Sequence, residues 1–181
     1  MIYCFLAGGF EEIEAIAPID ILRRAELDVT VVGIGGLAIV GSHGIAVGAD
    51  VTDSEVGLPD DIEAVILPGG MPGTLNLERS EVVSRFIEKA AEKGALIGAI
   101  CAAPSILGKR GLLSGKKATC FDGFECFLEG AEVVNEPSVT DGNIITARGA
   151  GAAIEFGLQM VAYLKGEKES KVLRKGMKCP Q

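Results

Sequence analysis

The segment Ala95-Leu-Ile-Gly-Ala-Ile-Cys-Ala-Ala-Pro104 changes abruptly from an apolar run to a cysteine that is followed by small residues and proline. A short apolar run that ends in a turn is typical of a buried strand. Proline fits the first turn of a helix, where its missing N–H is not needed. Cys101 is therefore predicted at a sharp strand-to-helix turn. Such a nucleophile elbow requires small residues two positions from the nucleophile, and Ala99 and Ala103 stand there.

Strand-like and helix-like segments alternate on both sides of this turn, which favours an α/β fold whose parallel sheet has helices on both faces. The pattern predicts strands at 1–7, 28–34, 62–67, 95–100, 117–121 and 143–147, helices at 11–25, 79–93, 102–109 and 151–165, and a hairpin or short strands at 37–52. No internal repeat or linker interrupts the chain. We therefore expect one domain over residues 1–181.

Composition excludes several classes of function. The formal net charge is −8 and Lys and Arg form no basic stripe, so we expect no nucleic-acid partner. No apolar run has the length of a membrane helix and the N-terminal segment is short and lacks a basic lead-in, so we expect no membrane partner and a cytoplasmic location. The 5 cysteines have no paired short spacing and the chain has 1 histidine, so we expect free thiols and no metal site.

The elbow has an electrostatic consequence for Cys101. A sulfur at a helix N-terminus faces unpaired N–H groups and the positive end of the helix dipole, which favours the thiolate. The alternative is that Cys101 is a small buried hydrophobe, which is the usual role of a free cysteine.

A second motif, Leu67-Pro-Gly-Gly-Met71, follows a predicted central strand. Ligand sites in open α/β sheets form outside the carboxyl ends of the strands. Glycines at this point let backbone N–H groups approach a ligand closely, which suits an oxyanion hole completed by the N–H of Ala102. The alternative is a plain turn.

The third motif is Gly8-Gly-Phe-Glu-Glu-Ile-Glu14, which lacks the glycine spacing of a dinucleotide site. Glu11 and Glu12 are expected to be solvent-exposed charges that the helix dipole favours. Glu14 shares a helical face with Pro18 and Ile21 and is therefore expected to point inward, while Pro18 should bend the helix. A buried Glu14 would have a raised pKa and could donate a hydrogen bond or a proton.

Together these motifs resemble the ThiJ/PfpI family, in particular its protein deglycase/glyoxalase III branch. The resemblance extends over nearly the whole chain and includes Thr146-Ala-Arg-Gly-Ala-Gly-Ala-Ala-Ile-Glu-Phe156. It implies a flavodoxin-like three-layer α/β sandwich (class I glutamine amidotransferase-like) with a mostly parallel sheet, a homodimer and no dissociable cofactor. It also implies that Cys101 is an oxidisable nucleophile beside a protonated Glu14, with Gly69, Gly70 and Ala102 as backbone donors.

The sequence departs from the family pattern at two positions. The peptidase-like branch carries histidine directly after the cysteine, where this chain has Ala102, so peptidase activity is disfavoured. Family members closest to the human protein carry a histidine near the cysteine at the position of Phe121, so proton transfer through that histidine is not expected here. His43 and Arg24 match positions where relatives have arginines at the dimer interface, and either could reach a partner subunit's pocket. The alternative for His43 is a structural role.

The resemblance implies a cysteine-dependent stress-response protein that acts on small reactive carbonyls or on glycated protein, for example by converting methylglyoxal to lactate. A redox-sensing chaperone that works through oxidation of Cys101 remains an alternative, so the sequence leaves open whether turnover occurs. A role in thiamine-thiazole metabolism would follow from the family name alone, because the chain has no phosphate-binding loop. Amidotransferase-like hydrolysis is excluded because no histidine follows His43.

Overall fold

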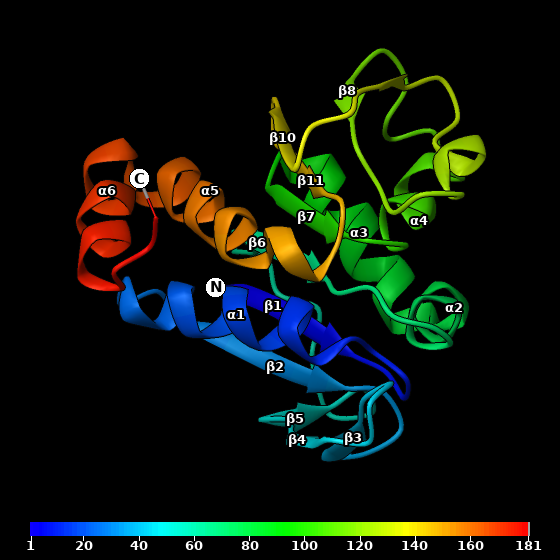
Figure 1. Cartoon of the computed structure of the whole chain (residues 1–181). Helices are drawn as coiled ribbons and strands as arrows, with labels where there is room; N and C mark the ends of the chain where they lie inside the picture. The colour runs from blue at the N-terminus through cyan, green and yellow to red at the C-terminus, as the bar shows by residue number, and fades with distance from the viewer. Residues whose placement is uncertain (181) are drawn as a thin grey trace.

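The computed structural model describes residues 1–180 and has a central 7-stranded sheet (Figure 1). The strand order is β10-β11-β7-β6-β1-β2-β5, and every neighbouring pair is parallel except β10 and β11. The strands are β1 (Ile2–Leu6), β2 (Val29–Gly33), β5 (Val51–Thr52), β6 (Ala64–Leu67), β7 (Leu96–Ile100), β10 (Ser138–Asp141) and β11 (Ile144–Ala147). The expectation of a mostly parallel sheet is confirmed.

Helices cover both faces of the sheet and make a three-layer sandwich. One face packs α1 (Glu12–Arg24), α5 (Ala153–Lys165) and α6 (Glu167–Gly176), and the other packs α2 (Gly73–Arg79), α3 (Glu81–Lys93) and α4 (Pro104–Gly108). In β1, Cys4 belongs to the first core and Phe5 to the second, because successive side chains of a strand point to opposite faces. Figure 1 shows α1 and α5 side by side in front of the sheet.

The contact between α1 and α5 depends on a glycine. A Cβ added at Gly157 would lie 3.1 Å from the Cα of Pro18 and 2.9 Å from the Cδ1 of Ile21. Helix α1 continues from Glu12 to Arg24 through Pro18, although proline has no N–H to donate to the carbonyl of Glu14. The close approach brings the middle of α1, at Pro18 and Ile21, against α5 at Gly157.

Several peripheral elements differ from the sequence prediction. The hairpin of β3 (Ala38–Val40) and β4 (Ala46–Gly48) is confirmed, but the strand predicted at 117–121 is only β8 (Lys117–Ala118), paired with β9 (Glu132–Val133) outside the main sheet. Helix α6 was not predicted, and beyond it Cys179 packs against the first core. The structure also has two short 3-10 turns, η1 (Glu125–Phe127) and η2 (Ala150–Ala152). Within residues 1–180, no helix combines the length and apolar composition that crossing a membrane requires.

Candidate active site

Cys101 occupies the turn between β7 and α4 with a backbone φ of +65°. Residues other than glycine rarely adopt this left-handed conformation, and such strain gathers at functional sites. Two hydrogen bonds hold the turn: the Cys101 N–H donates to the Ala147 carbonyl at 2.8 Å, and the Phe121 N–H donates to the Cys101 carbonyl at 2.8 Å. The strained elbow predicted from the small neighbours is therefore present, and its side chain is half-buried.

Gly69 separates Cys101 from Glu14 at the carboxyl end of β6. A Cβ added at this glycine would lie 2.6 Å from the Cβ of Cys101 and 2.6 Å from Oε2 of Glu14. Only a residue without a side chain lets the thiol and the carboxyl approach this closely. The N–H of Gly69 donates to Oε2 of Glu14 at 3.0 Å, so this donor is engaged with the acid rather than free to bind an oxyanion as the sequence predicted.

Glu14 is buried, as helical spacing predicted, with 1% of its surface exposed. Its backbone N–H donates to Oε2 of Glu11, the N-cap of α1, at 2.7 Å. Burial is the main cause that raises the pKa of Glu14, to about 7; hydrogen bonds with Cys101 and with the backbone of Gly69 and Ala150 lower it, and the charge of Glu11 raises it further. The acid can therefore gain or lose a proton near neutral pH.

The thiol differs from the sequence prediction. Burial first, and then the carboxylate of Glu14, raise the pKa of Cys101 to about 12, although the backbone N–H groups of Gly70 and Ala102 lower it. Helix α4 spans only Pro104–Gly108, so its dipole offsets little of this cost. A freely formed thiolate is therefore not the resting state while Glu14 is ionised. Above about pH 7 the resting pair is therefore an ionised Glu14 beside a protonated Cys101 thiol.

Glu12 and His43 form a second cluster next to the first. Glu12 is buried, which contradicts the prediction of a solvent-exposed charge: Oε1 accepts the His43 N–H at 2.8 Å, and Oε2 lies 2.9 Å from Nδ1 of His43. Burial raises the pKa of Glu12, but hydrogen bonds from His43 and from the backbone outweigh it and lower the pKa to about 2. The signal in the sequence was Gly41, since a Cβ there would lie 2.4 Å from the Glu12 carboxyl.

Glu11, Glu12 and His43 are also the residues that could hold a metal ion, because each offers a ligand atom within 4.8 Å of the others. The Glu12 carboxylate also accepts backbone hydrogen bonds from His43 and Ile45 and so fastens the β3–β4 hairpin to α1. Arg24 lies at the other end of α1, about 15 Å along the helix from Glu14, and pairs with Asp20. Roles for Arg24 or His43 in a partner subunit's pocket stay predictions.

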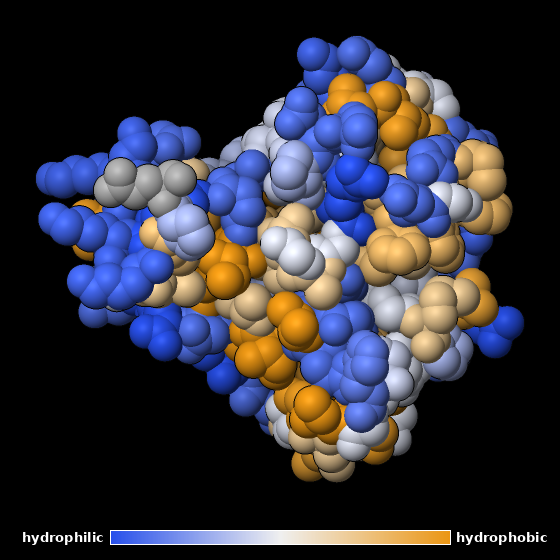
Figure 2. Space-filling view, in the orientation of Figure 1, coloured by the Kyte–Doolittle hydropathy of each residue, from blue (hydrophilic) through white to orange (hydrophobic). Residues whose placement is uncertain are grey.

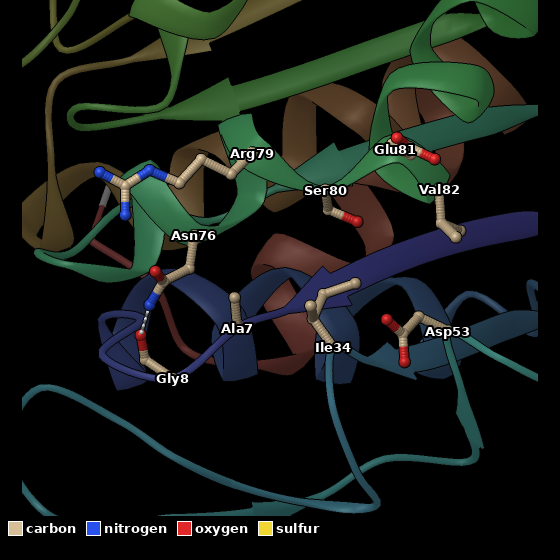
Figure 3. A pocket seen from close by; sticks show the side chains of 9 residues that line it. All are labelled: Ala7, Gly8, Ile34, Asp53, Asn76, Arg79, Ser80, Glu81 and Val82. Carbon is tan, nitrogen blue, oxygen red and sulfur yellow. Dashed lines mark hydrogen bonds between the residues drawn. The ribbon is translucent and has the colours of Figure 1, made fainter.

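A hollow of about 470 Å³ opens beside this site and is lined in part by Phe121, Arg148 and residues 149–152. The sequence reasoning did not identify these lining residues as a group. A separate hollow of about 430 Å³ lies outside the carboxyl ends of β1 and β2 (Figure 3). There the Asn76 amide donates to the Gly8 carbonyl at 2.8 Å. The described lining of this second hollow includes no site residue predicted from the sequence.

The fold and the site define a class: flavodoxin-like α/β sandwiches with a cysteine at the elbow after a central strand and a buried glutamate beside it. The model described as "DJ-1/PfpI family" matches residues 1–163, and the chain belongs to this family.

Two relatives show how far the similarity extends. Protein dj-1beta of Drosophila melanogaster is 38% identical over 175 residues, which cover 95% of this chain and 93% of the relative. Its crystal structure superimposes with a TM-score of 0.93 at 36% identity, covering 99% of this chain and 98% of that one. Deglycase PfpI of Pyrococcus furiosus is 32% identical over 162 residues, covering 88% and 96%.

Proposed function

We propose that the chain is a cysteine-dependent stress-response protein that converts small reactive carbonyls, with methylglyoxal giving lactate, and needs no dissociable cofactor. The observation that carries the proposal is the contact of the Cys101 thiol with a buried Glu14 whose pKa is about 7. A relative named as a deglycase supports the same class of substrate. Repair of glycated protein amines would use the same carbonyl chemistry at the same thiol.

The first step needs no free thiolate. Glu14 accepts the S–H proton while the Cys101 sulfur bonds to the aldehyde carbon, and the protonated acid then gives this proton to the former carbonyl oxygen. The product is a hemithioacetal. The N–H groups of Gly70 and Ala102, which lower the pKa of the Cys101 thiol in the resting site, would donate to the carbonyl oxygen as it gains negative charge.

The second step moves hydrogen within the substrate. The Glu14 carboxylate removes the proton from the carbon bonded to sulfur and returns a proton to the neighbouring carbonyl carbon through an enediol. This oxidises the first carbon to a thioester and reduces the second to an alcohol, so no external oxidant or reductant is required. Water then cleaves the thioester, releases lactate and restores the Cys101 thiol.

Lactate formation from methylglyoxal tests the proposal. Cys101→Ser should abolish it, and Glu14→Gln should lower the rate by about 10²-fold or more, because a positioned acid–base group contributes about that much. Cys126→Ser is the matched control, since Cys126 is an exposed thiol in η1 outside the site. Equal lactate production by wild type and Cys101→Ser would refute the proposal.

Oxidation sensing through Cys101 is the second candidate function. It is supported by the half-buried sulfur beside an acid that can carry a proton and could hydrogen-bond a sulfinate. The raised pKa of Cys101 counts against it, because the thiolate is the form that peroxide oxidises. Mass spectrometry after mild peroxide should find two added oxygens on Cys101 before any appear on Cys126. The reverse order would exclude this function.

A homodimer is the assembly we propose. Apolar side chains are exposed on α1, on the β3–β4 hairpin and at the start of α5, namely Ile13, Ile16, Val40, Ile45 and Ile154. Figure 2 shows hydrophobic patches over α1 and over the hairpin. An apolar patch rimmed by polar residues is typical of a protein–protein interface.

Sedimentation measurements test the dimer. Ile16→Asp should shift wild-type dimer to monomer, because a charge would be buried in the interface. Val172→Asp is the matched control, since Val172 is an exposed apolar residue on α6. A monomeric wild type, or an Ile16→Asp protein that stays dimeric, would contradict the proposed interface.

A further inference from the structure

The hollow beside the site is far larger than the methyl group of methylglyoxal. Its volume is about 470 Å³, and its walls are Phe121, Pro137 and the small residues of the 149–152 turn. The ring of Phe121 is not part of either core, since 51% of its surface is exposed. A large aromatic side chain in such a position offers a contact face to a ligand.

Gly149 connects this hollow to the reacting groups. A Cβ at this position would lie 3.5 Å from the Phe121 ring and 3.7 Å from Oε1 of Glu14. The space that the missing side chain leaves therefore runs from the ring to the acid. Phe121 is also tied to the elbow, because its N–H donates to the Cys101 carbonyl. A substituent carried by an aldehyde at the sulfur can thus extend along this passage onto the ring.

The charged groups of the hollow are already paired. Nη2 of Arg148 lies 2.5 Å from Oδ1 of Asp122, and Nη1 of Arg148 bonds to the Asn135 amide oxygen. The guanidinium is therefore held and neutralised from within the protein. Oε1 of Glu14 lies at the inner end of the passage, 3.7 Å from a Cβ built at Gly149, and the ionised carboxylate would repel an anion there. What remains for a ligand is the apolar wall.

We propose that this hollow binds the aromatic or branched apolar substituent of the carbonyl substrate, with Phe121 as its main contact. The inference rests on the proposed function and narrows its substrate class to 2-oxoaldehydes that carry an apolar group, such as phenylglyoxal, which gives mandelate by the same two steps. Ring-on-ring packing adds to the burial of apolar area and would favour such a substrate over methylglyoxal.

Competing initial rates test the specificity. We expect kcat/KM for phenylglyoxal to exceed that for methylglyoxal by roughly tenfold, and Phe121→Ala to remove roughly that factor from the ratio. Gly149→Ala should also lower the ratio, because its methyl group fits without a clash but occupies the passage. Phe127→Ala is the matched control, since Phe127 is an exposed aromatic residue in η1 that does not line the hollow. A ratio that Phe121→Ala leaves unchanged would overturn the inference.

Binding without turnover separates this inference from the proposed function. Ligand-observed NMR should show acetophenone binding to wild type and several-fold weaker binding to Phe121→Ala, with acetone bound by neither. If this binding is found but no aldehyde is turned over, the hollow is a binding site for apolar groups and the proposed function is refuted. If turnover depends on Cys101 but acetophenone binds wild type and Phe121→Ala equally well, the proposed function stands and the role of the hollow is refuted.

Discussion

Glu14→Gln should change how the stability of the protein depends on pH. Burial raises the pKa of Glu14 from 4.5 to about 7. Between these values the native protein holds a proton that the unfolded chain has lost, so the free energy of unfolding falls as pH rises. The contribution is fully present below pH 4.5 and lost above pH 7. At 1.36 kcal/mol for each pKa unit, the loss amounts to about 3 kcal/mol.

Urea denaturation at pH 5 and pH 8 measures this effect. The wild type should lose about 2–3 kcal/mol more than Glu14→Gln over this interval, because glutamine cannot ionise. His43 and the other titrating groups are common to both proteins, so their contributions cancel in the comparison. Glu129→Gln is the control for replacing an acid, since Glu129 is exposed, and this variant should follow the wild-type profile.

Parallel pH profiles for wild type and Glu14→Gln would refute the reasoning. They would mean that Glu14 ionises in the native protein as readily as in the unfolded chain. Glu14 would then not gain or lose a proton near neutral pH, and the acid–base role proposed for it would lose its basis. A profile that rises with pH more steeply in the wild type would have the same consequence.

Three further predictions concern neighbouring residues. Gly69→Ala should lower the free energy of unfolding, measured by urea denaturation, by about 1–3 kcal/mol, because its methyl group overlaps the side chains on either side. Gly151→Ala is the control and should lose no stability, since nothing lies within 4 Å of the new Cβ. Equal losses in the two variants would refute the overlap. Thr74→Val should not destabilise, since the buried Thr74 hydroxyl has no hydrogen-bond partner among the described residues; a loss above about 1 kcal/mol would reveal a bond to that hydroxyl. The pKa of His43, raised by its hydrogen bond to Glu12 and by the Glu12 charge, should fall in Glu12→Gln when followed by proton NMR of this single histidine, and an unchanged value would place the cause elsewhere.

The fold could be predicted because its central strands are buried on both faces. Strands such as β6 and β7 have no exposed residue, so they occur in the sequence as unbroken apolar runs that end in glycine, proline or cysteine. The edge of the molecule lacks this signal. Strand β10 is half-exposed and α6 is strongly polar, and both are stabilised mainly by packing on neighbours that the local sequence does not specify.

The core of the site was predictable for a related reason. The backbone strain at Cys101 requires small neighbours, and the closeness of Cys101 to Glu14 requires glycine at position 69. Both constraints therefore leave small residues in the sequence. The inward direction of Glu14 follows from helical spacing relative to Pro18 and Ile21. The elbow at Cys101 and the inward direction of Glu14 can be predicted without knowing which segment lies opposite, whereas the adjacency of these two residues across Gly69 was implied only by the family resemblance.

The errors arose where a second segment decides the outcome. Helical position alone places Glu12 at a solvent-facing first turn, and only the β3–β4 hairpin that folds over it turns the carboxylate into a buried acceptor for His43. The pKa of Cys101 was misjudged for the same reason: the local sequence supplies the N–H donors that favour a thiolate, but burial and the negative charge of Glu14 come from other segments and outweigh them. Because the donors remain in place, the thiol becomes easier to ionise as soon as Glu14 takes up a proton, and the acid therefore controls the reactivity of the sulfur.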